Sequence, residues 1–301
     1  MASWFDTWVT ISINIPVLML FLVIVSTAIV IGIFAIQRSR RRLQTMTQQL
    51  EQLRSEFRTS KQSTSRDPAS QDAYLQFIYN LSHEVSNPLQ SVQTNLENMA
   101  DCSPEEVGRW QQYYAIVRQE MKRLSTLTEN LRLLSQLESV ESRVKREPVN
   151  LRSVIEDVIM AQAERAESGN IHLNYEGPNR PAKVLGDRGL LHELILNLVD
   201  NSIKYSKETG GNIAIKLNEE PHVMHVIVKD QGLGIPAEDL PFIFNTAYRS
   251  SNKLTIHRKG SGLGLAIVKR IVDQHEGQIH ADSVPEQGTT ISVDLPLYSP
   301  D

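Results

Sequence analysis

The sequence is poor in cysteine, with Cys102 as the single thiol among 301 residues. One thiol cannot form an internal disulfide framework or a cysteine zinc cluster, so a small disulfide-rich domain and a cysteine zinc domain are both excluded. A reducing compartment suits most of the chain. The sequence also lacks an excess of one charge, because 31 basic residues stand against 35 acidic ones. This balance predicts no nucleic-acid partner.

Charge is absent altogether from one long segment near the N-terminus. Residues 15–36 hold no charged side chain over 22 positions, which is enough for a helix to cross a hydrocarbon core of about 30 Å. We therefore predict a transmembrane helix there. The basic run RSRRR at 38–42 follows it, so the positive-inside rule places the C-terminal part in the cytoplasm and residues 1–14 outside. We expect a single-pass protein of the inner cell membrane, with too little chain outside for an external sensor domain.

Two connecting segments follow the predicted span. Residues 37–59 place apolar side chains at steps of three and four, which predicts a short amphipathic or coiled-coil helix. Residues 60–71, SKQSTSRDPASQ, combine serines, charges and a proline. That composition predicts a flexible linker.

Residues 72–140 predict a helical hairpin. Ser103 and Glu106 at the break form a predicted capping box, with Pro104 at the first position of the second helix. One hairpin cannot bury both apolar seams, so we expect two copies to pair as a dimeric four-helix bundle. The first seam is Ile78, Leu81, Val85, Leu89, Val92, Leu96 and Met99, and the second is Trp110, Tyr114, Val117, Met121, Leu124, Leu131 and Leu134.

The stretch NLSHEVSNPLQS at 80–91 carries candidate chemistry on the first helix. His83 lies about 200° around the helix from Leu81, so we expect it in solvent, with Asn87 one turn along on the same side. Glu84 is expected on that polar face as well. An exposed histidine is usually an ordinary surface residue, but a neutral imidazole beside a carboxylate can act as a nucleophile. Pro88 is expected to loosen the helix next to it.

Residues 148–298 predict an α/β sandwich. Helices are expected near 151–167 and 262–275, in addition to the helix LHELILNLVDNSIKYS that begins at Leu191. Strands are expected near 171–176, 212–218, 223–229, 277–283 and 289–296.

The helix that begins at Leu191 has a polar face of unusual composition. Glu193, Asn197, Asn201 and either Lys204 or Tyr205 share one side, while Leu191, Leu194, Ile195, Leu198 and Ser202 point inward. Asparagine is a poor helix former and gains nothing from exposure there. Amide and carboxylate oxygens suit Mg²⁺, and a lysine can meet a phosphate.

Two glycine-rich loops follow, DQGLGIP at 230–236 and GSGLGLAIVKRI at 260–271. Glycines let backbone approach a nucleotide closely, and amides at a helix start attract phosphate. A dinucleotide-binding motif is excluded, because the first loop lacks a third glycine and the second does not follow a strand. The sequence has no GxxxxGK[ST] motif, which excludes a P-loop.

The run HEVSNPL resembles the H-box of sensor histidine kinases. The ordered asparagine stripe, DxGxG and GxGLGL motifs resemble the ATP-binding domain that these kinases share with DNA gyrase, the Bergerat or GHKL ATPase fold. The resemblance covers residues from about 72 to 297 and implies the cofactors ATP and Mg²⁺. It identifies His83 with the phosphoacceptor, Glu84 with its acidic partner and base, and Asn87 with a position that helps to place water for dephosphorylating the partner regulator.

The same resemblance implies the nucleotide contacts. Asn197 would be the Mg²⁺ ligand with Glu193 behind it, and Asp230 would accept a hydrogen bond from the adenine amino group. Residues 246–260 would form a mobile lid carrying Arg249, Lys253, His257, Arg258 and Lys259. The remaining contacts would be Asn201 and Lys204 with phosphate, Tyr205 beside the base, Gly232 and Gly234 around the base pocket, and Gly260, Gly262 and Gly264 around the phosphates.

Two positions depart from the family pattern. Ala247 stands where the phenylalanine box, here FIFNTAYR, usually has a second aromatic residue, which could alter how the lid packs. Ser202 replaces the common alanine after the second asparagine. Neither change removes a reactive group.

The resemblance implies ATP-dependent autophosphorylation of His83 and phosphotransfer to an aspartate of a separate response regulator, by a homodimer. Within this interpretation, Asn87 suggests phosphatase activity too. We expect no receiver domain after the last strand, and input through a membrane sensor partner, the bilayer or the juxtamembrane helix. Two alternatives stay open. A non-catalytic adaptor switched by ATP would bind the regulator without reacting, which the intact HE pair argues against, and a chaperone-like ATPase would have no use for HExxNP.

Overall fold

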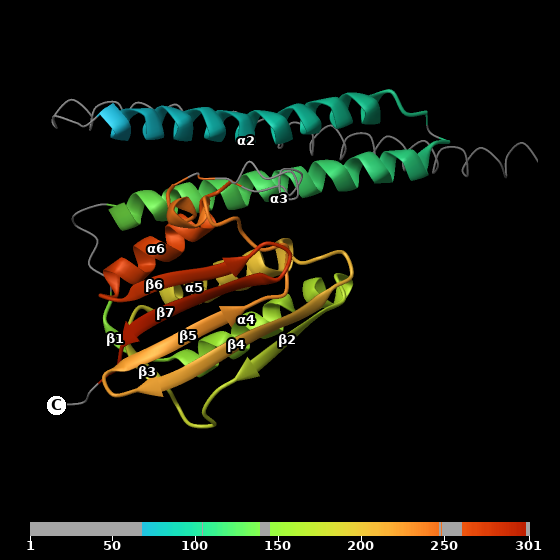
Figure 1. Cartoon of the computed structure of the whole chain (residues 1–301). Coiled ribbons are helices and arrows are strands. Elements are labelled where there is room, and N and C mark those ends of the chain that lie inside the picture. Colours follow the sequence, from blue (N-terminus) through green and yellow to red (C-terminus); the bar gives the residue numbers. More distant parts are fainter. Residues whose placement is uncertain (1–67, 104, 139–144, 247, 249–260, 299–301) are drawn as a thin grey trace, which may run out of the picture.

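The computed structural model describes residues 68–103, 105–138, 145–246, 248 and 261–298. They form a helical hairpin that lies against a two-layer α/β unit (Figure 1). The predicted segments 1–14, 15–36 and 37–59 lie outside the described residues, as does the linker up to residue 67. No helix within the described ranges is both long and apolar enough to cross a membrane.

The hairpin consists of α2 (Pro68–Ala100) and α3 (Val107–Glu138). Residues 68–71, predicted as the end of the linker, are helical, because a proline suits the first turn, where its missing N–H is not needed. The helix also continues through Pro88, so the expected local loosening is not seen. Pro88 is buried, and its packing offsets the one backbone hydrogen bond that a proline removes.

The turn between the two helices forms the predicted capping contact in part. The Ser103 amide donates to Glu106 Oε2 over 3.1 Å, and the Ser103 hydroxyl also donates to that oxygen. The helix α3 nevertheless begins at Val107, three residues later than expected. The Glu106 carboxylate closes the turn in front of the helix, where it also pairs with Arg109.

The apolar seams of the hairpin are only partly buried. Val92, Met99 and Val117 form a small buried cluster. Trp110 and Tyr114, predicted to lie in the second seam, are 38% and 45% exposed, and their rings stack with centroids 5.4 Å apart. This exposure agrees with the expectation that one hairpin cannot bury both seams, because one partner helix does not cover the whole width of α3.

The α/β unit has a five-stranded sheet in the order β2-β4-β5-β7-β6, with β2 and β4 parallel and the other pairs antiparallel. The predicted sandwich is confirmed, and the pair β1-β3 was not predicted because each strand has only four residues. The elements are β1 (Glu147–Asn150), α4 (Leu151–Ser168), β2 (Ile171–Glu176), β3 (Lys183–Gly186), α5 (Arg188–Lys204), β4 (Gly211–Glu220), β5 (Val223–Lys229), the short 3₁₀ helix η2 (Leu240–Phe242), α6 (Gly264–Gln274), β6 (Gln278–Val284) and β7 (Gly288–Pro296).

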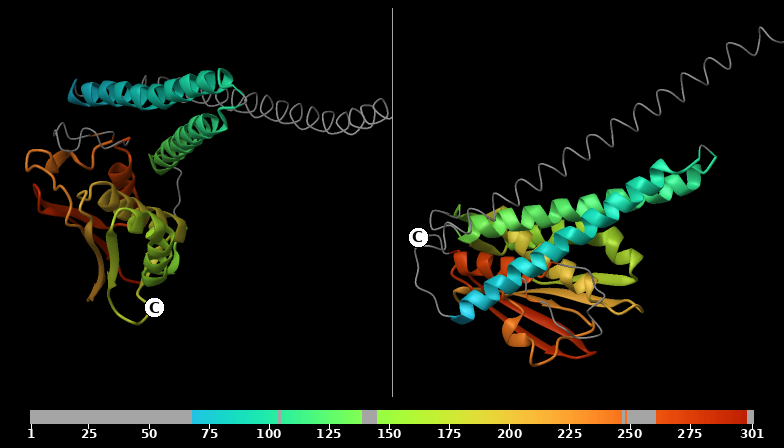
Figure 2. Two further views of the ribbon diagram at one scale, coloured as in Figure 1. Left: turned by 90° about the vertical axis from the view of Figure 1, so that its right-hand side faces the viewer. Right: turned by 90° about the horizontal axis from the view of Figure 1, so that it is seen from above.

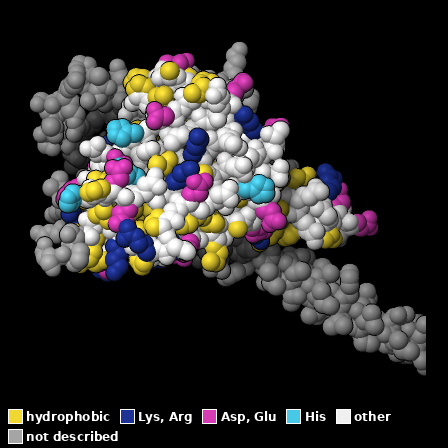
Figure 3. Space-filling model, turned by 60° about the horizontal axis from the view of Figure 1, so that its bottom comes forward, with side chains coloured by type: hydrophobic (Ala, Val, Ile, Leu, Met, Phe, Trp, Pro, Cys, Tyr) yellow, Lys and Arg dark blue, Asp and Glu magenta, His cyan; other side chains and the backbone are white. Residues whose placement is uncertain are grey.

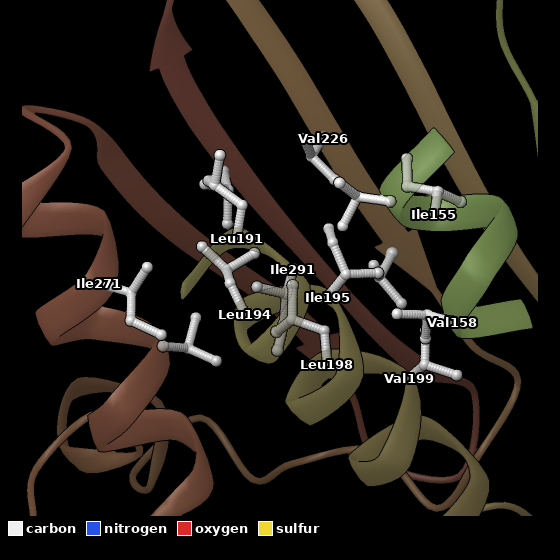
Figure 4. Packing of buried hydrophobic residues seen from close by; sticks show 14 of the residues in the cluster. Ile155, Val158, Leu191, Leu194, Ile195, Leu198, Val199, Val226, Ile271 and Ile291 are labelled. Carbon is white, nitrogen blue, oxygen red and sulfur yellow. The ribbon is translucent and has the colours of Figure 1, made fainter. Parts of the chain in front are cut away.

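The core lies between the sheet and the helices α4, α5 and α6. Figure 4 shows side chains of α5 between Ile155 and Val158 of α4 on one side and Ile271 of α6 on the other. The predicted inward residues of α5, Leu191, Leu194, Ile195, Leu198 and Ser202, are all buried. Alternate residues of β4 and β5 face this core. On the described surface seen in Figure 3, acidic and basic side chains are interspersed with scattered apolar ones.

The second half of α3 connects the hairpin to the α/β unit. Leu127, Leu131, Leu134 and Leu137 belong to the same apolar cluster as the core of α5 and α6. Near the C-terminal end of α3, the Leu137 carbonyl accepts a hydrogen bond from Gln274 Nε2 of α6 over 2.8 Å. The two views of Figure 2 show the hairpin along the helical side of the unit. This packing places α2 and α3 opposite the C-terminal half of α5 and the start of α6.

Candidate nucleotide and phosphoacceptor site

The polar face of α5 forms one wall of the candidate site. Asp187 caps this helix by accepting from the amides of Gly189 and Leu190. Nearly three turns along, Asn197 Nδ2 donates to both the backbone carbonyl and the Oε1 carboxylate oxygen of Glu193, each over 2.9 Å. Both amide hydrogens of Asn197 are therefore used, and its Oδ1 is left as an acceptor that faces the start of α6.

The start of α6 approaches α5 closely at Gly264. A Cβ added at Gly264 would lie 2.7 Å from Asn197 Oδ1, so any side chain there would displace the asparagine. This close approach brings Asn197 to the N-terminus of α6, where backbone amides favour an anion. Gly262 lines the same region, whereas Gly260 lies outside the described residues.

A second group of residues forms a small pocket around Asp230, directly after β5. Asp230 Oδ1 accepts from the amides of Gly232 and Thr289, over 2.8 Å and 3.1 Å. The Ser202 hydroxyl donates to Oδ2 over 3.3 Å. Burial raises the pKa of Asp230 above its usual range, and these three hydrogen bonds oppose the rise. Ser202 thus supports the aspartate from the buried side of α5.

The pocket in front of Asp230 has a volume of about 120 Å³. Its walls are largely apolar, and Tyr205 and Tyr248 stand at its edge. Gly234 needs its glycine because its φ of +67° is left-handed and a Cβ would overlap the Val284 carbonyl. The apolar lining residues are Leu198, Ile235, Pro236, Ile243, Leu265 and Ile291. A flat, apolar ring with one polar edge suits this space.

A larger cleft of about 500 Å³ lies between the α/β unit and the hairpin. On one side it is lined by Asn197, Asn201, Lys204, Gly262 and Gly264, so the structure brings together most of the predicted phosphate and metal residues. Lys204 Nζ lies 4.6 Å from the centre of the Tyr205 ring. The opposite side comes from α2 and α3, and includes Glu84, Arg123, Thr126 and Asn130.

The phosphoacceptor stretch of α2 is arranged differently from the prediction at one residue. His83 and Asn87 are exposed, as expected. Glu84 is only 8% exposed, and its Oε2 accepts from Arg123 Nη2 of α3 over 2.6 Å. The expectation that Glu84 shares the polar face of His83 is wrong, because one residue step turns a side chain by about 100° around a helix. Glu84, rather than His83, lines the cleft.

The segment after η2 lines one side of the pocket in front of Asp230, which we call the base pocket. The Tyr248 hydroxyl donates to Asp239 Oδ1 over 2.7 Å, and its ring lies beside Phe242. Burial and this hydrogen bond to Asp239 raise the pKa of Tyr248 to about 12. Phe244 is half-buried, while Ala247 and the predicted lid residues 249–260 lie outside the described residues.

Sequence reasoning missed two groups that shape the site. Thr289 contributes its backbone amide, which no sequence pattern marks. Arg123 stands next to Leu124 at the border of the second seam, between buried Val117 and Leu127. A charged side chain at the edge of an apolar seam was the available signal, but its partner on the other helix could not be read from it.

Two family models match the parts that form this site. Residues 73–140 match the "His Kinase A (phospho-acceptor) domain", and residues 186–299 match the "Histidine kinase-, DNA gyrase B-, and HSP90-like ATPase". Together the two matches cover more than half of the chain. The chain belongs to the sensor histidine kinases.

Curated histidine kinases align with most of this chain. Sensor histidine kinase WalK of Bacillus subtilis (strain 168) is 32% identical over 223 residues, which cover 73% of this chain and 36% of WalK. Drug sensory protein A of Synechocystis sp. is 32% identical over 271 residues, 84% of this chain and 40% of that protein. This histidine kinase chain therefore spans well under half the length of these two relatives.

The fold of this histidine kinase is also found among solved structures. Acinetobacter baumannii histidine kinase AdeS superposes with a TM-score of 0.57 at 23% identity, covering 72% of this chain and 98% of that one. A structure of histidine kinase ThkA in complex with response regulator protein TrrA superposes with a TM-score of 0.56 at 23% identity, covering 74% of this chain and 61% of that one. At this identity the two likenesses show the shared fold.

Proposed function

We propose that this chain is an ATP-dependent protein-histidine kinase that phosphorylates His83 and passes the phosphoryl group to an aspartate of a separate response regulator. The observation that carries this function is the cleft of about 500 Å³, which has Asn197, Asn201 and Lys204 on one wall and α2, the helix of His83, on the other. Catalysis in such a site consists mostly of positioning and charge neutralisation.

The base pocket supports recognition of adenine. Asp230 Oδ1 is held by two backbone amides, so the carboxylate cannot rotate away. Asp230 lines the pocket, and its Oδ2 accepts one hydrogen bond from Ser202 and has capacity for a further donor such as the adenine amino group. Tyr205 would lie beside the base, with Gly232 and Gly234 forming the turn that bounds it.

The donor set on α5 fits Mg²⁺ together with the phosphates. Asn197 Oδ1 and the Glu193 carboxylate are oxygen ligands of the kind this ion prefers, and phosphate oxygens and water would complete its shell. The bound ion would neutralise phosphate charge. Asn201 and Lys204 would contact the phosphates, and the amides at Gly262 and Gly264 would receive them at the start of α6. Gly260 and the basic lid residues 249–259 are proposed to cover the nucleotide.

The transfer step forms a nitrogen–phosphorus bond at His83. The neutral imidazole attacks the γ-phosphorus while the bond from that phosphorus to the β–γ bridging oxygen breaks, and ADP leaves. Glu84 is proposed to accept the imidazole proton, since it lies on the cleft side of α2 one residue away. A response regulator would then take the phosphoryl group, and Asn87 would help to place water when that regulator is dephosphorylated.

We further propose a homodimer joined through the hairpin, anchored in the inner membrane by residues 15–36. The exposed rings of Trp110 and Tyr114 support pairing of two hairpins, because such a stacked pair on a helix is normally covered. The apolar segment 15–36 and the basic run after it support the anchor. A signal would then arrive through the membrane segment or a membrane sensor partner.

The kinase assignment is tested with the full chain in membranes and γ-labelled ATP. We expect acid-labile, base-stable label on the protein, which His83→Gln abolishes. His172→Gln is the matched control, because His172 is an exposed histidine on β2, away from the cleft. Label that persists in His83→Gln would overturn the assignment. Asn87→Ala should slow loss of phosphate from the regulator, and an unchanged rate would remove the phosphatase role.

A further inference from the structure

Arg123 occupies a position in the cleft that the proposed mechanism leaves without a role. It extends from α3 with its side chain 27% exposed, between two carboxylates that are nearly buried. Its Nη2 lies 2.6 Å from Glu84 Oε2, and its Nη1 lies 3.8 Å from Glu120 Oε2. The side chains of Glu84 and Glu120 are 11% and 10% exposed. A single guanidinium therefore balances two acidic groups from two different helices.

This ion pair fixes where the Glu84 carboxylate points. A guanidinium is planar and always charged, so its hydrogen bond to a carboxylate sets both distance and orientation. Removing one member of a buried pair leaves the other charge without compensation, and that charge must move toward water. Without Arg123, the Glu84 carboxylate would leave its place on the cleft side of α2, one residue along the helix from His83.

Lys122 of α3 also lines the cleft, and two further cations there have surroundings different from those of Arg123. Lys204 lies on α5 over the Tyr205 ring, and Arg165 of α4 is paired with Asp200 of α5. Both belong to the wall that would hold the nucleotide. Arg123 belongs to the hairpin and its shortest ion pair joins α3 to α2, so its contacts tie it to the phosphoacceptor helix rather than to the phosphates.

We propose that Arg123 is a positioning residue for the phosphorylation of His83, and that it acts by holding the Glu84 carboxylate where the imidazole proton is accepted. This role rests on the kinase function proposed above. Arg123 makes no contact with the reacting atoms in this role. Its loss should therefore lower the rate of transfer and leave ATP binding unchanged.

The test compares Arg123→Gln, Arg123→Lys, Glu84→Gln and the double variant Arg123→Gln/Glu84→Gln in the full chain. For each, the maximal rate constant of autophosphorylation and the ATP concentration for half-maximal rate are measured. We expect Arg123→Gln to lower the rate constant on the order of 10- to 100-fold, which is at most the smallest contribution typical of general base catalysis, about 100-fold. The half-saturating ATP concentration should stay within about twofold, and Arg123→Lys should restore part of the rate.

The double variant decides whether Arg123 acts through Glu84. If it does, Arg123→Gln adds nothing in the Glu84→Gln background, where the glutamine leaves no carboxylate to be held. That background also removes one of the two charges that Arg123 balances, so the double variant leaves less uncompensated buried charge than the single Arg123→Gln variant does. Effects that multiply in the double variant would overturn the proposal, as would a raised half-saturating ATP concentration in Arg123→Gln, which marks a phosphate ligand.

Arg132→Gln is the matched control. Arg132 lies on the same helix and pairs with Glu129 within it, but it is 56% exposed and lies outside the cleft lining. We expect this variant to keep the wild-type rate, and an equal loss in it would overturn the role of Arg123. An unlabelled wild-type protein would instead refute the kinase function itself, whereas labelled wild type with an unaffected Arg123→Gln refutes only this inference.

Discussion

His275 is a buried histidine that joins the end of α6 to the start of α5. It is 5% exposed, its Nδ1 lies 2.7 Å from the Ile271 carbonyl, and its Nε2 accepts from the Asp187 amide over 3.2 Å. Burial lowers the pKa of His275, because a charged ring would be desolvated there, and the hydrogen bond to Ile271 only partly opposes this. The neutral ring is thus the form that fits the fold.

This lowered pKa predicts a loss of stability in acid. The unfolded chain binds a proton at His275 at a higher pH than the folded chain does, so the free energy of unfolding falls as pH drops below the unfolded pKa of about 6.5. Urea unfolding of wild type and His275→Asn, between about pH 7.5 and about pH 5, should show a shallower decline for the variant. Parallel declines would contradict the assignment.

His225 lies on the open face of the sheet, and its pKa is shifted in the opposite direction to that of His275. Its Nδ1 lies 2.6 Å from Asp294 Oδ1 of the neighbouring strand β7, and this hydrogen bond raises the pKa of His225 against a smaller effect of desolvation. The stabilisation is fully present below the unfolded pKa of about 6.5, and it is lost as pH rises through the raised folded-state pKa.

Asp294→Asn tests that sign. The variant should be less stable than wild type at about pH 6, and the difference should shrink as pH rises toward about 9, when the wild-type histidine also loses its charge. Urea unfolding across this range measures it. A difference that stays constant with pH would show that Asp294 stabilises the strand pair by other means.

Gly264 is predicted to be essential for nucleotide binding. In Gly264→Ala the new Cβ would lie 2.7 Å from Asn197 Oδ1, so the asparagine must leave the position proposed for the metal. We expect ATP affinity to fall by at least about tenfold, the equivalent of about 1.4 kcal/mol. Calorimetric titration with Mg·ATP measures it. Affinity equal to wild type would remove Asn197 from the site.

At the scale of elements, α3 contains a glycine that serves no packing purpose. Among the described residues, no atom would lie within 4 Å of a Cβ at Gly108, and the residue is helical. Gly108→Ala should therefore raise the free energy of unfolding by about 0.5–1 kcal/mol through the lower entropy of the unfolded chain. Denaturant unfolding measures the change, and the variant should keep wild-type affinity for ATP. A loss of stability would mean that Gly108 has a neighbour in the assembled protein.

The elements of the α/β unit could be read from the sequence because periodicity determines which residues share a face. Leu191, Leu194 and Leu198 repeat at helical steps, so the opposite face of α5, with Asn197 and Asn201, followed directly. Periodicity does not say which neighbour a face meets. It could not predict that Glu84 turns toward Arg123, since this depends on how two helices cross.

Short elements and backbone contacts were beyond sequence reasoning for a different reason. The strand β1 passes directly into α4, and its four residues are too few for an alternating pattern to appear. The amide of Thr289 reaches Asp230 only because β7 lies beside β5 in the sheet. Trp110 and Tyr114 fit the helical seam by spacing, but their burial depends on a surface that one chain does not supply.

At the scale of the whole molecule, those two rings predict how copies associate. Tyr114→Glu places a charge on an exposed apolar face of α3 and should weaken a dimer formed through the hairpin. Light scattering of the full chain in detergent, over a range of concentrations, measures the change in mass. Met160→Glu is the control, because Met160 is 76% exposed on α4. An unchanged dimer in Tyr114→Glu would place the interface elsewhere.

The first half of α3 packs in one apolar cluster, with Val92 and Met99 of α2, and its second half packs in another, with the core of the α/β unit. A twist of the hairpin at its turn is therefore passed along one continuous helix to the leucines in its second half. These leucines, Leu127, Leu131, Leu134 and Leu137, belong to the same apolar cluster as residues of α6. A rotation of α3 would move these leucines relative to α6. If nucleotide binding at the base pocket changes this packing, it is coupled to rotation of α3, and each then shifts the other by the same factor because such coupling is reciprocal.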